Sequence, residues 1–276
     1  MIIISKFSSL YFGQRYEWTS PHDTDKCYLL KYKTGDVIRV QFTGSDNYYE
    51  IKKYNIDKNE TVTFQADIIY DDRLYKRIFE ILFYETSFGL YELSIIGTSE
   101  VATSYFRIVE DKEVENTLFF SATHRKNEYD TIFYDSYQGQ RRFNFRCEGG
   151  ICPGDKKQAL DNKTFRDQRF VAHQTTAEAY EISMLTAGST IGVPQWVGNR
   201  INHIFNLSDV QVNGIDTIRS DASTPELVKL GDYYPLYVFK MNVEQSDDEL
   251  VVTTNKDEPV TNGDFNNDFN NDFNNN

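Results

Sequence analysis

Apolar and polar residues alternate along short segments of the first hundred residues. In GDVIRVQFTG, Ile38, Val40 and Phe42 occupy one side of an extended chain, and the residues between them are polar. LYELSII, at residues 90–96, repeats this period of two. Such a period is typical of a half-buried β-strand. With glycines near the segment ends, the pattern predicts a small antiparallel β-sandwich over residues 1–100.

The strand pattern continues after residue 100 and changes period once. VATSYFRIVED, NTLFFSA, DTIFYD, RRFNFRCEGG and AEAYEISMLTAG have the composition of strands. In GVPQWVGNRINHIFNLSD, by contrast, Trp196, Val197 and Ile201 fall on one helical face, which predicts a helix near 194–206. The Asn-Gly pair at 213–214, between alternating apolar residues, then predicts a tight hairpin.

Together these patterns predict a mainly β fold with two antiparallel β-sandwich-like domains. Residues 1–100 are expected to form the N-terminal sandwich. Residues 101–246 are expected to form a second, α+β domain that is rich in strands and holds the one helix. Residues 247–276 are acidic and rich in Asn, and we expect them to be a disordered tail.

The tail ends NGDFNNDFNNDFNNN, in which an Asp-Phe pair recurs every four residues. This spacing places Phe265, Phe269 and Phe273 on one face of either a helix or a strand. Asn and Asp disfavour both structures, and three rings are too few to offset the entropy lost on ordering. Two interpretations stay open: a dispensable tail grown by repeat expansion, or assembly contacts in which the three Phe side chains dock into a groove on a neighbour.

Charge limits the classes of partner. The 29 basic and 42 acidic residues give a net charge of −13, and nine acidic residues against one basic residue from Glu244 onward place −8 of it in the last 33 residues. Without a basic surface to neutralise phosphates, neither nucleic acid nor an anionic membrane is an expected partner. No apolar run is long enough to span a bilayer. The opening MIIISKFSSLYF indicates a strand rather than a signal peptide, because it lacks a positive start and a cleavage site.

Candidate chemistry is sparse. EGGICPGDKK has the glycine spacing of a phosphate loop, but Asp155 replaces the lysine, which favours a Gly/Pro loop between strands. Cys147 and Cys152 have the spacing of zinc ligands, yet no second pair accompanies them. No Ser lies in a Gly-x-Ser-x-Gly sequence. We therefore expect no catalytic, cofactor-binding or metal-binding residues, and no enzymatic activity.

Two tryptophans are compatible with a different function, the binding of sugars. Trp18 and Trp196, with the many Tyr residues, have flat amphipathic rings on which sugars stack. A glycan- or receptor-binding module with a host glycan as ligand is therefore one alternative, and a hydrolase with a site assembled from scattered residues is another. We expect Trp196 instead to pack the predicted helix against the sheet of the second domain.

A resemblance favours a structural role. AEAYEISMLTAGSTIGVPQWVGNRINHIFNLSDVQVNGIDTIRS and LYVFKMNVE resemble the C-terminal half of tail-associated structural proteins from tailed phages and prophages of Bacteroidota. CYLLKYKTGDVIRVQF and ATSYFRIVED are similar to the N-terminal half of the same proteins. The resemblance implies a virion component near the distal tail or baseplate, kept in the host cytoplasm before assembly. It also implies β domains that assemble as rings with copies of the chain and with other tail proteins, and it supplies no catalytic residues.

Overall fold

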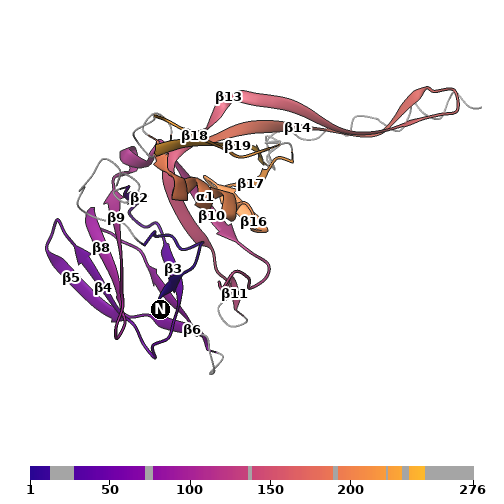
Figure 1. Ribbon diagram of the computed structural model, residues 1–276. Helices are drawn as coiled ribbons and strands as arrows, with labels where there is room; N and C mark the ends of the chain where they lie inside the picture. Colours follow the sequence, from indigo (N-terminus) through magenta and orange to yellow (C-terminus); the bar gives the residue numbers. More distant parts are fainter. Residues whose placement is uncertain are drawn as a thin grey trace, which may run out of the picture. The chain divides into compact units, whose positions relative to one another are not determined.

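Strands dominate the computed structural model, which describes residues 1–12, 28–71, 77–135, 139–188, 192–221, 223–231 and 236–245 (Figure 1). The mainly β class is confirmed, with several antiparallel sheets and, within these ranges, one α-helix. Residues 1–246 form one unit and residues 247–276 a second. The predicted assembly contacts Phe265, Phe269 and Phe273, and the disorder predicted for the tail, lie outside the described residues.

Two sheets are built from the first 109 residues. Their strands are β1 (Ile3–Ile4), β2 (Leu30–Lys33), β3 (Ile38–Gly44), β4 (Glu50–Asn55), β5 (Glu60–Gln65), β6 (Asp67–Asp71), β7 (Arg77–Phe83), β8 (Gly89–Ile96) and β9 (Val101–Val109). The order is β1-β3-β7-β6 in one sheet and β2-β9-β8-β4-β5 in the other. All pairs are antiparallel except β2 and β9. Phe83 of β7 meets Phe106 of β9 across the sheets, with 5.9 Å between ring centroids, which gives a sandwich-like arrangement.

The alternation of apolar residues sets the core of this half. Ile38, Val40 and Phe42 of β3 are buried, as the two-residue period predicts. On β8, Tyr91 and Leu93 are buried in the same way. Each set points into the space between the two sheets, where burial of the apolar side chains stabilises the fold.

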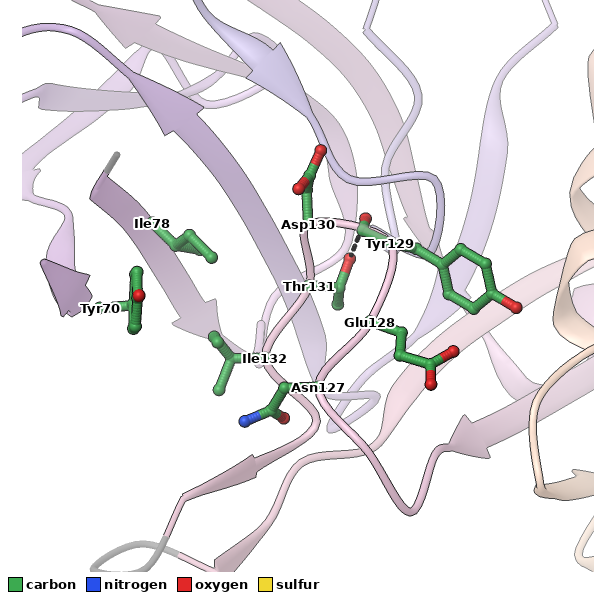
Figure 2. Close-up of a pocket in the computed structure, with 8 residues that line it drawn as sticks. All are labelled: Tyr70, Ile78, Asn127, Glu128, Tyr129, Asp130, Thr131 and Ile132. Carbon is green, nitrogen blue, oxygen red and sulfur yellow. Dashed lines mark hydrogen bonds between the residues drawn. The ribbon is translucent and has the colours of Figure 1, made fainter. Parts of the chain in front are cut away.

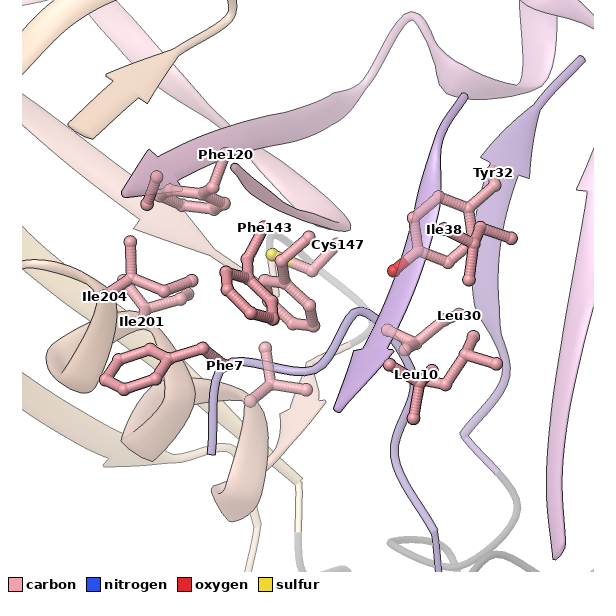
Figure 3. Close-up of a cluster of buried hydrophobic side chains, with 14 of the residues drawn as sticks. Phe7, Leu10, Leu30, Tyr32, Ile38, Phe120, Phe143, Cys147, Ile201 and Ile204 are labelled. Carbon is pink, nitrogen blue, oxygen red and sulfur yellow. The ribbon is translucent and has the colours of Figure 1, made fainter. Parts of the chain in front are cut away.

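β8 and β9 form a hairpin, and the domain boundary predicted near residue 100 falls in its turn. β9 pairs with β2 on its other edge, so it shares a sheet with strands from earlier in the chain. One hydrophobic cluster holds Phe7 and Leu30 together with Phe143 and Ile201 (Figure 3). The division of the chain into two domains at this point stays a prediction.

The rest of the chain forms a second strand system, entered through the short 3-10 helix η2 (Asp111–Val114). Its strands are β10 (Thr117–Thr123), β11 (Tyr134–Asp135), β12 (Gly139–Gln140), β13 (Phe143–Arg166), β14 (Ala172–Ala187), β15 (Val193–Pro194), β16 (Asp209–Val212), β17 (Ile215–Arg219), β18 (Glu226–Lys229) and β19 (Leu236–Gln245). β11 and β12 pair only with each other in the described part. The others follow the order β14-β13-β10-β16-β17-β19-β15, with β18 on β19. Because β19 also pairs with β14, the strand order closes on itself.

The α-helix, α1 (Gln195–Ile204), lies where the change of period predicts a helix. Pro194 precedes its first turn, where a missing N–H costs nothing. Val197, Ile201 and Ile204 are buried, and they form the face that packs against the sheet. No helix in the described ranges is long and apolar enough to cross a membrane.

Trp196 packs α1 against aromatic rings from other parts of the chain, including the edge of Tyr28 at 5.8 Å. Its ring stacks on Tyr11, with 4.1 Å between centroids and 3° between planes, and meets the edge of Phe145 on β13 at 6.4 Å. The contact with β13 confirms the packing role predicted for Trp196, and Tyr11 adds a partner from the N-terminal segment. Trp18 lies outside the described residues.

The hairpin predicted at 213–214 is confirmed. Val212 of β16 pairs with Ile215 of β17, which leaves a loop of two residues. Asn213 and Gly214 have φ values of 54° and 85°. Both are left-handed, as the tight turn that matches the twist of a β-hairpin requires.

Candidate functional site

β13 and β14 form a long hairpin of 24 and 16 residues. At its base, residues 182–187 of β14 pair with β13 on one edge and with β19 on the other. Farther out, β14 pairs with β13 alone among the described strands as far as Arg166 and Ala172, and Figure 1 shows this half of the hairpin running past the other labelled strands. We call residues 157–182 the hairpin arm. At about 3.3 Å per residue, residues 157–166 span about 30 Å.

The EGGICPGDKK motif lies inside β13, so the expected loop between two strands is wrong. Cys152 pairs with Met184 and Lys157 pairs with Ile182, so five steps of β13 match two steps of β14. Extra residues in one strand of a pair form a bulge. The bulge accommodates Pro153, which has no N–H to donate to the strand ladder.

The end of the arm is an ordered turn. The Asp167 carboxylate accepts hydrogen bonds from the backbone N–H groups of Arg169 at 2.8 Å and Val171 at 3.0 Å. The Phe170 N–H donates to the Asp167 carbonyl at 2.9 Å, and the Asp167 N–H donates to the Val171 carbonyl at 3.0 Å. The Arg166 guanidinium also donates to the Phe170 carbonyl, at 3.2 Å. These bonds hold the turn in one conformation, which lowers the entropy that a binding partner would have to remove.

Phe170 occupies a position in this turn that suits glycine. Its φ is 63°, in the left-handed region where a side chain costs about 1–2 kcal/mol. Its ring is 80% exposed. Neither the backbone conformation of Phe170 nor the burial of its ring therefore stabilises the chain by itself, and strained residues of this kind are concentrated at functional sites.

The hairpin tip, which we define as residues 163–172, is apolar and basic. Phe165 and Val171 are 53% and 51% exposed, and Lys163, Arg166 and Arg169 are exposed with them. Four basic and two acidic residues between 157 and 173 give this stretch a net charge of +2, which leaves −15 for the rest of the chain. The tip therefore has the charge opposite to that of the protein that carries it.

A hollow of about 420 Å³ lies beside the edge strand β6 (Figure 2). Tyr70 of β6, Ile78 of β7 and the loop 127–132 line it. Ile78 and Ile132 are buried and Tyr70 is 45% exposed, so the floor is apolar and the rim is open. Its volume falls in the range of about 300–1,000 Å³ that is typical of pockets for small molecules.

Two acidic residues line the same hollow, Glu128 and Asp130, and there is no basic residue in its described lining. Tyr129 between them is 50% exposed, and Figure 2 shows the side chains of Glu128 and Tyr129 on the opposite side of the loop from Ile78. Tyr129 and Asp130 have φ values of 57° and 59°, so the backbone is strained at two consecutive residues. We call this surface the acidic hollow. Arg125 precedes the loop in sequence and does not line the hollow.

Buried hydrogen bonds brace the floor of the acidic hollow. The Ile132 N–H donates to the Gln41 side-chain oxygen at 2.9 Å, and the Gln41 amide donates back to the Ile132 carbonyl at 2.9 Å and to Glu80 at 2.8 Å. The hydroxyls of Thr131 and Ser5 lie 2.6 Å apart. Because each of these groups is buried, breaking one bond would leave an unsatisfied polar atom. The strained loop is therefore held in a fixed shape.

Cys147 and Cys152 differ in their exposure to solvent. Cys147 is buried, and burial, reinforced by the neighbouring Glu148 carboxylate, raises the pKa of its thiol well above the usual range. Cys152 is exposed. No three His, Cys, Asp or Glu side chains of the described residues are grouped so as to hold a metal ion. Cys27 lies outside those residues.

The sequence predicted a strand over the last part of the hairpin arm, at 177–182, but not the rest of the arm or the acidic hollow. The residues of the hairpin tip are exposed apart from Asp167, so this stretch lacks the alternation by which a half-buried strand is recognised. A net positive stretch that holds two Phe residues in an acidic chain is the signal that was available. The acidic hollow joins residues about 60 positions apart, which local patterns do not connect.

Comparison with known proteins adds no family. No protein-family model, curated protein or solved structure matches the chain.

Proposed function

We propose that the protein is a non-enzymatic structural component of a phage tail or baseplate, which assembles with copies of itself and with neighbouring tail proteins. The observation that carries the proposal is the hairpin arm. Among the described residues, the arm beyond Ile182 pairs only with itself, and its ordered turn exposes Phe165, Phe170 and Val171. Exposed rings on an extended element suit a contact with another subunit better than a site for chemistry.

Assembly also accounts for the open strand edges of the arm. Unpaired edges with apolar side chains are an aggregation hazard in a free monomer, and neighbouring subunits would cover them. A net charge of −13 limits such association before assembly begins. The resemblance to tail-associated proteins of Bacteroidota phages gives this assembly its setting: the virion tail, after a period in the host cytoplasm.

The location of the chain in particles tests this function. Tailed particles induced from the source strain should contain the chain by mass spectrometry, and gold-labelled antibodies should decorate their tails. Purified protein should show no turnover of polysaccharide or peptidoglycan. Particles that lack the chain, or label confined to the capsid, would contradict the proposal.

A further inference from the structure

The hairpin tip and the acidic hollow are complementary in charge and in character. The tip presents Phe170 between Arg166 and Arg169, and it is net positive. The hollow offers an apolar floor of Ile78 and Ile132, and its lining includes the acidic residues Glu128 and Asp130, with the Glu128 side chain on the far side of the loop from Ile78. An apolar anchor that enters a pocket, with opposite charges around it, is the usual composition of an interface centre.

Both surfaces are also strained and braced. Phe170 adopts a left-handed conformation in a turn held by the Asp167 carboxylate. Tyr129 adopts one in a loop anchored through Ile132 to Gln41. Strain of this kind persists where the surrounding structure fixes it, and it is concentrated at functional positions. Neither surface needs to reorganise before it binds, which favours affinity.

We propose that the hairpin tip of one copy docks into the acidic hollow of a second copy, with the Phe170 ring on the apolar floor and Arg169 extending over the loop 127–132 towards Glu128. This rests on the proposed assembly function and names its self-contact. A second copy fits best because the tip needs an acidic apolar partner and the same chain carries one. Nucleic acid and anionic membranes are complementary in charge to the arginines of the tip, but they are not complementary to the acidic hollow.

The contact joins two different patches, so it is heterologous. Each copy offers one tip and one hollow, and a head-to-tail series of such contacts closes into a ring or grows into a filament. A charged rim of this kind also makes association weaken as salt rises, because exposed charges are screened.

Reversal of single charges tests the pairing by sedimentation velocity on the full chain. Arg169→Glu reverses a charge on the tip and leaves the hollow unchanged. Glu128→Arg reverses a charge at the hollow and leaves the tip unchanged. For each variant alone, the affinity of self-association should fall at least about tenfold relative to the wild type. A mixture of the two should recover the larger assemblies, because the unchanged tip pairs with the unchanged hollow and the reversed tip pairs with the reversed hollow. The double variant should recover the larger assemblies.

Phe170→Gly tests the anchor without endangering the fold. Glycine relieves the left-handed strain at φ 63°, so the melting temperature should hold or rise while association falls at least about tenfold. Tyr48→Ser is the matched control, since Tyr48 is exposed and lies on neither surface. Its association should equal that of the wild type.

Several results would overturn the docking proposal. These are a wild type that stays monomeric at all concentrations, a Phe170→Gly variant that assembles normally, or reversed-charge variants whose mixture associates no better than each variant alone. Binding of monomers to DNA or to vesicles of anionic phospholipid through Arg169 and Phe170 would do the same. Failure of the tail function is seen separately, as absence of the chain from particles.

Discussion

Arg200 shows how a single residue joins distant parts of this chain. Its guanidinium is buried and donates to the carbonyl oxygens of Ser8 at 2.7 Å and Leu10 at 3.3 Å. It also lies 5.2 Å from the ring of Phe145 and 5.4 Å from that of Trp196. Burial lowers the pKa of Arg200 to about 10, so the group stays charged at neutral pH. Carbonyl dipoles and aromatic faces stabilise that charge.

Replacement of Arg200 separates the charge from its geometry. Arg200→Met removes the buried charge but leaves two carbonyls without donors, and should cost about 2–3 kcal/mol of unfolding free energy. Arg200→Lys retains a buried charge but lacks the planar guanidinium that donates to both carbonyls. It should therefore lower the unfolding free energy more than Arg200→Met does. Urea denaturation followed by circular dichroism gives the order. A lysine variant more stable than the methionine variant would show that charge alone matters here.

The cysteines offer a second test at the residue scale. In a Cys27→Ser background, Cys152 should react rapidly with a thiol reagent at pH 8, because it is exposed. Cys147 should react only when the protein unfolds, since burial both blocks access and raises its pKa. Ellman's reagent with and without urea measures this. Two equally fast thiols in the folded protein would refute the packing described around Cys147.

At the scale of elements, two adjacent glycines have unequal roles at the base of the hairpin. A Cβ on Gly149 would overlap the carbonyl oxygen of Thr186 and lie 2.9 Å from the Ala187 Cα, on the paired strand β14. A Cβ on Gly150 would meet nothing within 4 Å. The glycine that resembled part of a phosphate loop therefore permits two strands to approach closely.

Substitution with alanine should separate these two glycines. Gly149→Ala should lower the free energy of unfolding by about 2–4 kcal/mol, because the clash is with backbone that cannot rotate away. Gly150→Ala is the neighbouring control and should change it by less than about 0.5 kcal/mol. Thermal and urea unfolding of both variants provide the comparison. Equal effects would mean that β13 and β14 are not paired closely at this point.

Elements with one buried face were predictable from the sequence. β3 places its apolar residues on one side and polar Arg39 and Gln41 on the other, and α1 buries one face, so their apolar residues follow periods of two and 3.6. The turn at 213–214 was predictable because its backbone conformation demands Asn and Gly. The hairpin tip buries no face and β13 is interrupted by a bulge, so no strand pattern is visible in the sequence of the tip. The acidic hollow depends on how Tyr70 and the loop 127–132 meet in space, which no local period encodes.

At the scale of the whole molecule, the net negative charge is distributed unevenly along the chain. Removing residues 247–276 takes away eight acidic residues and one lysine, which changes the net charge from −13 to −6. Residues 1–246 form a unit of their own. We infer that the charge of residues 247–276 contributes to repulsion between free copies.

Truncation tests that division and the role of the DFNN steps. A chain ending at Gln245 should unfold at the same urea concentration as the full chain, because residues 1–246 form a unit of their own. A chain lacking only Asn262–Asn276 should fold and also assemble normally, since the near-identity of the three steps favours repeat expansion over contacts selected one by one. Sedimentation velocity and particle assembly measure the second point. Loss of assembly with intact folding would instead assign docking to Phe265, Phe269 and Phe273, and loss of folding would place the segment in the core.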